Sequence, residues 1–184
     1  LPGTTSVHVL SVRNECKELL FVVEREADGR EPLVRCINFG LDGMQSFSFT
    51  LEEERSAVLV PAGQVGTYLY EPNASVLKAG AFKQIAVRTG VKKLQVNSHL
   101  YTADHLVSDF PGRRFRVDEV LSFTGKLCKG LSKTIPQANI TVRNFPLSVE
   151  ELRKRTKITD GGHVYLFATT LVDGEKVLVK CSKA

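Results

Sequence analysis

The amino-acid sequence predicts an α/β fold of the mixed α+β kind, in which a β-rich N-terminal part precedes regions that alternate strands and helices. Two observations predict it. The first sixty residues show strand patterns with no helical period between them, at residues 7–12, 19–23, 33–39 and 46–51. The rest of the chain alternates β and α signals and ends in a hairpin, which Asp173-Gly174 marks between two apolar runs.

Chain length and one boundary motif divide the sequence into three parts. A chain of 184 residues is long enough for one large domain or two small ones with a buried core. Pro61-Ala62-Gly63 interrupts the pattern after the β-rich part. We therefore expect a β-rich N-terminal part at residues 1–62, a strand–helix–strand unit at 63–116 and an α/β module at 117–184.

Cysteine usage and hydropathy predict a cytoplasmic protein. The four cysteines are scattered and form no CxxC pair, which is typical of small buried thiols in a reducing compartment. No apolar run reaches the length of a membrane-spanning helix, and no signal-peptide pattern opens the chain. His8, His105 and His163 have no partners at metal-ligand spacing, so we expect neither a metal site nor a membrane partner.

Charge is unevenly distributed along the chain. Residues 1–62 hold six Lys and Arg against ten Asp and Glu, whereas residues 63–184 hold nineteen against ten. The basic second part indicates a polyanionic partner, with nucleic acid as the first candidate. The acidic first part carries no chemical motif, and turns are expected at Ala27-Asp28-Gly29 and Leu41-Asp42-Gly43. Glu52-Glu53-Glu54 is interpreted as a solvated strand end.

Residues 66–101 predict a strand, a crossover helix and a second strand. Asn73 fits the N-cap of the helix and Gly90 its C-terminal cap, and residues 94–101 then alternate with the period of a strand. Such a unit is parallel by default, so both strands would end at one edge, where open α/β sheets bind ligands. That edge would hold four polar side chains as a candidate ligand site, which are Glu71, Asn73, His99 and Tyr101. The alternative is a helix cap, a strand-end carboxylate and a polar face.

Residues 113–133 carry the strongest signal for a binding surface. Arg114 and Arg116 alternate with apolar residues on a predicted strand, and Arg113 precedes them. In the next predicted helix, residues 124–134, three lysines recur at i, i+3 and i+7, which are Lys126, Lys129 and Lys133. Lysine and arginine contacts to phosphates supply the affinity of RNA-binding proteins. A solvated helix face remains the alternative.

A second basic cluster lies on the helix at residues 148–157. Ser148 and Glu151 form a capping-box pattern, which makes this the best-marked helix in the sequence. Its basic residues are Arg153, Lys154, Arg155 and Lys157. Glutamates one turn earlier pair with two of them, so a solvated face is the favoured interpretation here.

Five segments carry a resemblance to a known family. They are RNECKELL (13–20), YLYEPNASVLKAGAFK (68–83), VNSHLYTADHLVSDFPGRRF (96–115), NITVRNFPLSVEELRKR (139–155) and HVYLFATTL (163–171). With them the sequence resembles the C-terminal region of bacterial class I SAM-dependent methyltransferase-like proteins. The resemblance implies a ferredoxin-like central unit followed by a THUMP-like module, THUMP being an RNA-binding module. It also implies tRNA or rRNA as a partner and an upstream methyltransferase domain in the same polypeptide.

The sequence lacks the catalytic signatures of that family. No acidic-Gly-x-Gly-x-Gly loop follows a strand, and Glu71-Pro72-Asn73 does not match the Asp/Asn-Pro-Pro-aromatic signature of amino methyltransferases. We therefore expect no catalytic residue and no cofactor in this chain, with S-adenosylmethionine bound by the upstream domain. Because Leu1 opens the chain in place of methionine, an excised part of a longer polypeptide is expected.

Three functions remain open from sequence. The first is the RNA-substrate-binding region of a SAM-dependent RNA methyltransferase, inactive by itself. The second is a free-standing enzyme that uses Glu71 and His99 as acid and base, although no nucleophile–base–orienter set is present. The third is a protein-interaction module that binds through the acidic β-rich part.

Overall fold

The computed structural model describes residues 2–26, 29–41 and 43–184, and it confirms a mixed α+β fold rich in sheet. The predicted turns at 27–29 and 41–43 lie partly outside the described residues. The chain divides into two compact units. Unit 1 comprises Leu1–Leu59, Glu71–Val91 and Ser108–Arg113, and unit 2 comprises Val60–Tyr70, Lys92–Val107 and Arg114–Ala184.

The β-rich part of unit 1 forms a four-stranded sheet, which confirms the four predicted strands. Its strands are β1 (Thr4–Val12), β2 (Glu15–Val23), β3 (Leu33–Gly40) and β4 (Gly43–Phe49), in the order β2-β1-β3-β4. β1 is parallel to β3 and antiparallel to β2, and β3 is antiparallel to β4. One face of the sheet is buried through Val9, Cys36 and Phe49, because these side chains share a face across three strands.

The acidic run after β4 is helical, so its interpretation as a strand end was wrong. Helix α1 (Leu51–Ser56) begins after Thr50, whose side chain accepts a hydrogen bond from the Glu53 backbone N–H. The Glu53 carboxylate accepts from the Thr50 backbone N–H at 2.7 Å and completes a capping box. Carboxylates in a first helical turn are also stabilised by the helix dipole.

The single helix predicted after Asn73 is two short helices, α2 (Ala74–Ala79) and α3 (Gln84–Thr89). Gly80 ends α2 in the left-handed region, with φ of 80°, and so prevents the first helix from continuing. Gly90 ends α3 in the same way, as predicted. α2 contacts β1, β2 and β3 within unit 1.

The predicted parallel strand pair was also wrong. β5 (Tyr68–Pro72) pairs with β7 (Tyr101–Ala103) in antiparallel orientation, and β6 (Lys92–Lys93) pairs with β7 antiparallel as well. Residues 95–98 form a turn, closed by a hydrogen bond from the Ser98 backbone N–H to the Gln95 carbonyl. Leu94 and Leu100 are fully buried whereas Val96 is 63% exposed, so the alternating pattern does not mark one strand face.

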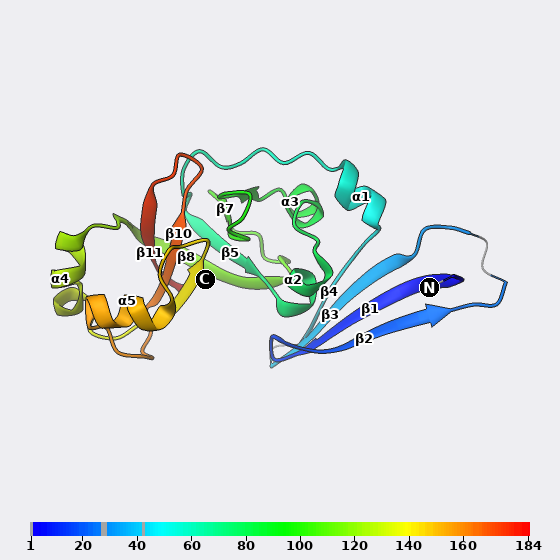
Figure 1. Ribbon diagram of the computed structural model, residues 1–184, viewed down its shortest axis with the longest axis horizontal. Helices are drawn as coiled ribbons and strands as arrows, with labels where there is room; N and C mark the ends of the chain where they lie inside the picture. Colours follow the sequence, from blue (N-terminus) through cyan, green and yellow to red (C-terminus); the bar gives the residue numbers. More distant parts are fainter. Residues whose placement is uncertain (1, 27–28, 42) are drawn as a thin grey trace. The chain divides into compact units, whose positions relative to one another are not determined.

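Unit 2 contributes to a seven-stranded sheet in the order β6-β7-β5-β8-β11-β10-β9. Its remaining strands are β8 (Gly112–Ser122), β9 (Asn139–Arg143), β10 (Tyr165–Thr170) and β11 (Lys176–Lys183). Helices α4 (Gly125–Thr134) and α5 (Val149–Thr156) contact each other and pack on one face through Leu131 and Leu152 (Figure 1). The opposite face is buried through Phe115 and Phe167, whose rings meet edge to face.

Three further findings concern membrane spans, metal ligands and cysteines in the described part of the chain. None of its helices is long and apolar enough to cross a membrane. Its residues hold no group of three or more metal-ligating side chains. All four cysteines carry free thiols, and burial raises the pKa of Cys36 and Cys181 to about 12, which makes these two thiols unreactive at neutral pH.

Candidate nucleic-acid interface

Helix α4 places three lysines on one exposed side. Thr124 caps the helix, since its side-chain oxygen accepts from the Leu127 backbone N–H at 3.1 Å. Cys128 and Leu131 turn inward and are buried, which fixes the rotation of the helix about its axis. The opposite side therefore presents the lysine stripe, which we define as Lys126, Lys129 and Lys133, all exposed.

The lysine stripe carries uncompensated positive charge. The first turn of α4 contains no acidic residue, and among the described residues no carboxylate lies within ion-pair distance of the three lysines. Arg155 of α5 adds to this charge: it lies near enough to Cys128 to lower the pKa of that thiol, although burial raises it by more. The side of α4 next to α5 is therefore basic as well.

The arginines of β8 lie far along the strand from the lysine stripe. Phe115 points into the sheet face opposite α4 and α5, so Arg114 and Arg116 project on the helical face. Arg116 pairs in register with Ser182, whereas Ser122, next to the start of α4, pairs with Val177. Six residues of strand span about 20 Å. The two arginines and the lysine stripe thus share a sheet face at opposite ends of β8.

Arg113, which was also predicted as a phosphate ligand, binds a carboxylate within unit 1. Its Nε donates to Glu71 Oε2 at 2.8 Å and its terminal nitrogen bonds the same oxygen. The Glu71 side chain is 2% exposed and that of Arg113 41%. The adjacent Gly112 is required for this approach, since a Cβ there would lie 2.1 Å from the Glu71 carbonyl oxygen.

Asn73 is confirmed as the N-cap of α2 and is the centre of a polar network in unit 1. Its Oδ1 accepts from the Val76 backbone N–H at 3.1 Å and from the Ser75 hydroxyl at 2.7 Å. Its Nδ2 donates to Gln45 at 3.0 Å, and Gln45 in turn donates to the Gly112 carbonyl. These bonds explain why a buried amide is present at this position.

In unit 2, His99 directly follows the turn at residues 95–98, and Tyr101 lies on β7. His99 has a φ of 49°, which is uncommon for a residue with a side chain. Burial, and to a lesser extent the charges of Lys93 and Arg143, together lower the pKa of His99 to about 4. Above pH 5 the ring is therefore neutral and cannot attract an anion by charge. Tyr101 is fully buried, with the Lys93 ammonium 5.9 Å from its ring centroid.

The second basic cluster is divided between internal contacts and solvent. Arg153 pairs with Asp160 and donates to the Ala138 and Ile158 carbonyls, so it fastens the loop after α5. The other members, Lys154, Arg155 and Lys157, are exposed. Ser148 and Glu151 form the predicted capping box, in which the Glu151 carboxylate accepts from the Ser148 backbone N–H at 2.7 Å.

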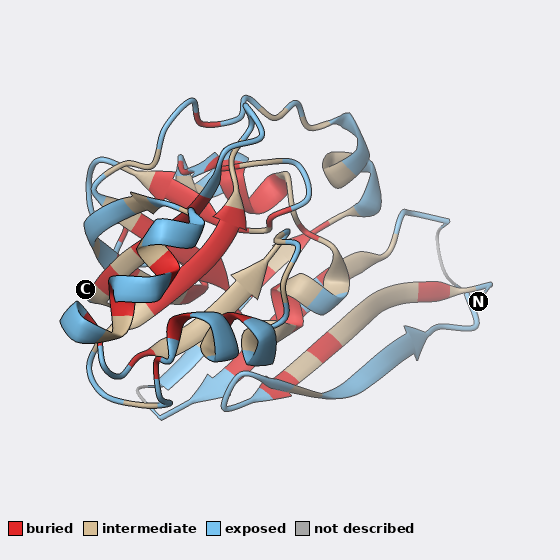
Figure 2. Cartoon of the chain, turned by 60° about the vertical axis from the view of Figure 1, so that its left-hand side comes forward, coloured by how far each residue is buried: buried red, intermediate tan, exposed pale blue. Residues whose placement is uncertain are grey.

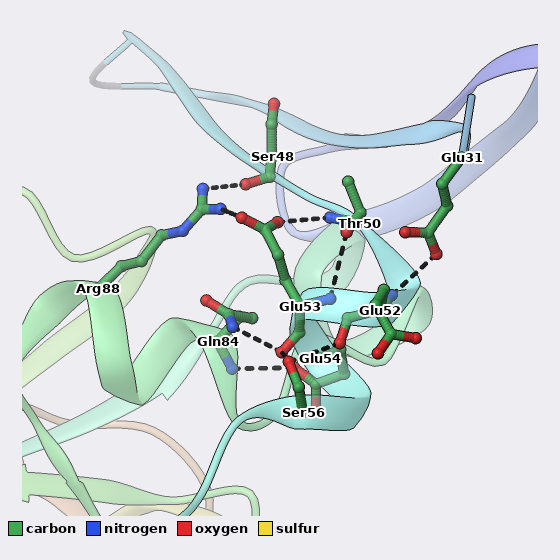
Figure 3. Close-up of polar contacts among 9 residues, drawn as sticks. All are labelled: Glu31, Ser48, Thr50, Glu52, Glu53, Glu54, Ser56, Gln84 and Arg88. Carbon is green, nitrogen blue, oxygen red and sulfur yellow. Dashed lines mark hydrogen bonds and ion pairs between the residues drawn. The ribbon is translucent and has the colours of Figure 1, made fainter.

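Sequence reasoning missed a charged contact between α1 and α3 (Figure 3). The Glu54 carboxylate accepts hydrogen bonds from three successive backbone N–H groups, those of Phe82, Lys83 and Gln84, at 2.9–3.1 Å. Glu53 pairs with Arg88 of α3 at 2.7 Å, as Figure 3 shows. The capping-box spacing Thr50-x-x-Glu53 was a signal that could have revealed α1.

Comparisons with known proteins identify two domains within the basic second part of the chain, residues 63–184. Residues 68–111 match the model of a ferredoxin-like domain, and residues 112–183 match that of a THUMP domain-like region. The chain carries a ferredoxin-like and a THUMP-like domain. Both domains were expected from the sequence, although the parallel strand pair predicted for the first of them was wrong. A comparison with curated proteins found no match.

A solved structure matches the whole chain. It is that of a "putative methyltransferase" from Porphyromonas gingivalis W83, with 43% sequence identity, a TM-score of 0.94 and coverage of 100% of this chain. This chain spans 47% of the length of that protein. The lysine stripe, Arg114 and Arg116 all fall in the THUMP-like domain, which holds fourteen Lys and Arg against seven Asp and Glu.

Proposed function

We propose that this chain is the RNA-substrate-binding region of a SAM-dependent methyltransferase that acts on tRNA or rRNA, and that it is not catalytic by itself. The observation that carries the proposal is the lysine stripe on α4, three exposed cations without carboxylate partners among the described residues of a THUMP-like domain. The likeness to the P. gingivalis protein supports the link to methyl transfer.

The stripe suits a phosphate backbone for physical reasons. Lysines at i, i+3 and i+7 span about 10 Å along one side of a helix, a length that covers more than one phosphate of a strand. Each ammonium that neutralises a phosphate releases counterions, which favours binding and makes it dependent on salt. Arg155 next to the stripe adds a planar donor that can pair bidentately with phosphate or stack on an unpaired base.

The described residues do not fit a site for S-adenosylmethionine. Such a site uses a glycine-rich loop between a parallel strand and a helix, where the backbone approaches the cofactor closely. β1 and β3 each run into the next antiparallel strand of the sheet, and β9 is followed by Asn144-Phe145-Pro146. We therefore assign the methyl donor to another part of the polypeptide.

The test is a titration of RNA with the wild-type chain and with the variant Lys126→Gln/Lys129→Gln/Lys133→Gln. Unfractionated tRNA serves as the probe, and anisotropy is measured at several salt concentrations. We expect weaker binding and a salt slope lower by about one unit or less for each lysine. Unfolding should stay nearly unchanged, because surface substitutions usually alter stability by about 0.5 kcal/mol or less.

A charge-matched control separates a site from general attraction. Lys17→Gln/Arg25→Gln/Arg55→Gln removes the same three charges from exposed positions of unit 1. This control should bind tRNA like the wild type. Superimposable titrations of all three proteins would instead identify α4 as ordinary solvated surface. An equal loss of tRNA affinity in both variants would show that the affinity depends on the net charge of the chain and not on the lysine stripe.

A further inference from the structure

The edge strand β2 of the unit 1 sheet exposes a run of five large apolar residues. Its exposed fractions are 49% for Leu19, 44% for Leu20, 49% for Phe21, 41% for Val22 and 52% for Val23. Figure 2 draws almost the whole strand in the colour of exposed residues. Edge strands are normally protected by charges, prolines or short length. Residues 19–23 of β2 have none of these protections.

The exposed apolar surface lies on both faces of the sheet. Consecutive side chains of a strand point to opposite faces, so Leu19 and Phe21 share the face of buried Val9, while Leu20 and Val22 lie on the other. That other face is also exposed across the neighbouring strands, at three residues in register, which are Val12 (42%), Phe39 (46%) and Met44 (63%). Continuous apolar runs are typical of strands that are covered on both faces.

Among the described residues, β2 pairs with β1 alone, so the backbone groups of its other edge point to solvent. An open edge with apolar side chains on both sides is a template for an added strand. The exposed apolar run and the open backbone edge are both found at residues 19–23. A single added strand, with the apolar residues that accompany it, would cover both.

We propose that β2 is an internal strand in the full polypeptide, and that a strand from the methyltransferase-like half pairs with its open edge. Apolar elements of that half would then cover Leu20, Val22 and Phe39 on the outer face. The methyltransferase-like half is the part of the polypeptide outside this chain, and only its name rests on the proposed function. The P. gingivalis protein supports the existence of such a part. Its similarity to this chain extends over the whole sheet of unit 1, yet this chain spans 47% of its length.

Hydrogen exchange tests the proposal without RNA. The rates for residues 19–23 are measured in the 184-residue chain and in a chimera in which this chain replaces the matching region of the P. gingivalis protein. In the isolated chain, the β2 amides that point away from β1 should exchange freely. In the chimera, we expect their exchange to be at least tenfold slower.

Substitution separates docking from a structural effect. Phe21→Lys should leave the denaturation midpoint of the isolated chain nearly unchanged but abolish the added protection in the chimera. Val172→Lys, at an equally exposed position of unit 2, should change neither. Equal exchange rates in chain and chimera would overturn the proposal. A dimeric isolated chain, seen by light scattering with residues 19–23 already protected, would make a second copy the occupant. Either result leaves the tRNA titration unaffected.

Discussion

At the scale of single residues, His99 shows how burial and neighbouring cations together determine a charge state. Burial of the ring disfavours its protonation most, and the charges of Lys93 and Arg143 act in the same direction. Lys93 itself is 2% exposed and donates to the Val96 carbonyl at 2.8 Å, in the turn that directly precedes His99. His99 is therefore a neutral ring at neutral pH and not a cation that would add to an RNA surface.

The lowered pKa of His99 makes folding dependent on pH. The pKa is about 4 in the folded state against 6.5 for an unperturbed ring. The unfolded chain consequently binds more protons between these values, and the free energy of unfolding falls as the pH is lowered from 6.5 to 4. We expect a loss of about 1–2 kcal/mol from this residue, since solvent screens part of the shift. Urea denaturation at pH 7 and pH 4.5 measures it.

The variant His99→Asn isolates the contribution of this ring. Asparagine tolerates the positive φ of 49° at this position and does not titrate. Its stability should fall less than that of the wild type over the same pH interval. Parallel pH profiles for the two proteins would show that other groups account for the acid sensitivity.

At the scale of elements, α1 is attached to α3 by charge. α3 has no capping side chain of its own at Lys83, and the Glu54 carboxylate accepts from the backbone N–H groups of Lys83 and Gln84 at its start, which have no acceptor within the helix. Gln84 reinforces the contact through its side-chain amide, which donates to the Glu53 carbonyl at 2.7 Å. The contact is local to unit 1 and holds the end of the β-rich part against the ferredoxin-like segment.

Removing this distant cap should destabilise unit 1. Glu54→Ala leaves the Lys83 and Gln84 backbone N–H groups without their acceptor, whereas the Phe82 N–H still donates to the Gly80 carbonyl, and we expect a loss of about 1–2 kcal/mol, as for other caps. Glu52→Ala is the control, because the Glu52–Arg55 pair is exposed on both sides and such pairs contribute about 0–1 kcal/mol. Chemical denaturation compares the two variants. Equal midpoints would mean that water replaces Glu54 without cost.

At the scale of the whole molecule, local signals predicted elements better than they predicted their pairing. The capping box at Ser148, the hairpin at Asp173-Gly174 and the strands of the N-terminal sheet were read correctly, because each depends on neighbouring residues. The direction of β5 relative to β7 depends on contacts between distant residues, which periodicity does not encode.

For the candidate site, too, the sequence predicted the local arrangement on α4 but not the contacts between distant residues. The inward side of α4 follows from the spacing of Cys128 and Leu131, so the lysine stripe could be placed from sequence. The ion pair of Arg113 with Glu71 joins residues 42 positions apart, and sequence alone offered no signal for it. Nor could composition distinguish Lys93, which is buried, from the exposed lysines of α4.

The glycines of the chain bear on whether it can bind S-adenosylmethionine by itself. We expect no measurable binding of S-adenosylmethionine to the 184-residue chain, because its sequence has no glycine-rich loop after a strand, the element that lets the backbone approach a cofactor closely. A Cβ added at Gly66 or at Gly112 would lie within 3.0 Å of a backbone oxygen of another residue. The space beside these two glycines is therefore already occupied by the protein. Gly161 and Gly162 pack against the Gln137 side chain.

Titration calorimetry of the purified chain with S-adenosylmethionine checks this expectation, with tRNA as the positive control for an active preparation. The chain should give no heat above dilution for the cofactor while binding the tRNA. The chimera with the remaining part of the P. gingivalis protein, measured in the same way, asks whether that part supplies the cofactor site. A one-to-one isotherm with micromolar affinity for the chain alone would refute its assignment as a non-catalytic RNA-binding region, since the methyl donor would then be held beside the lysine-bearing domain itself.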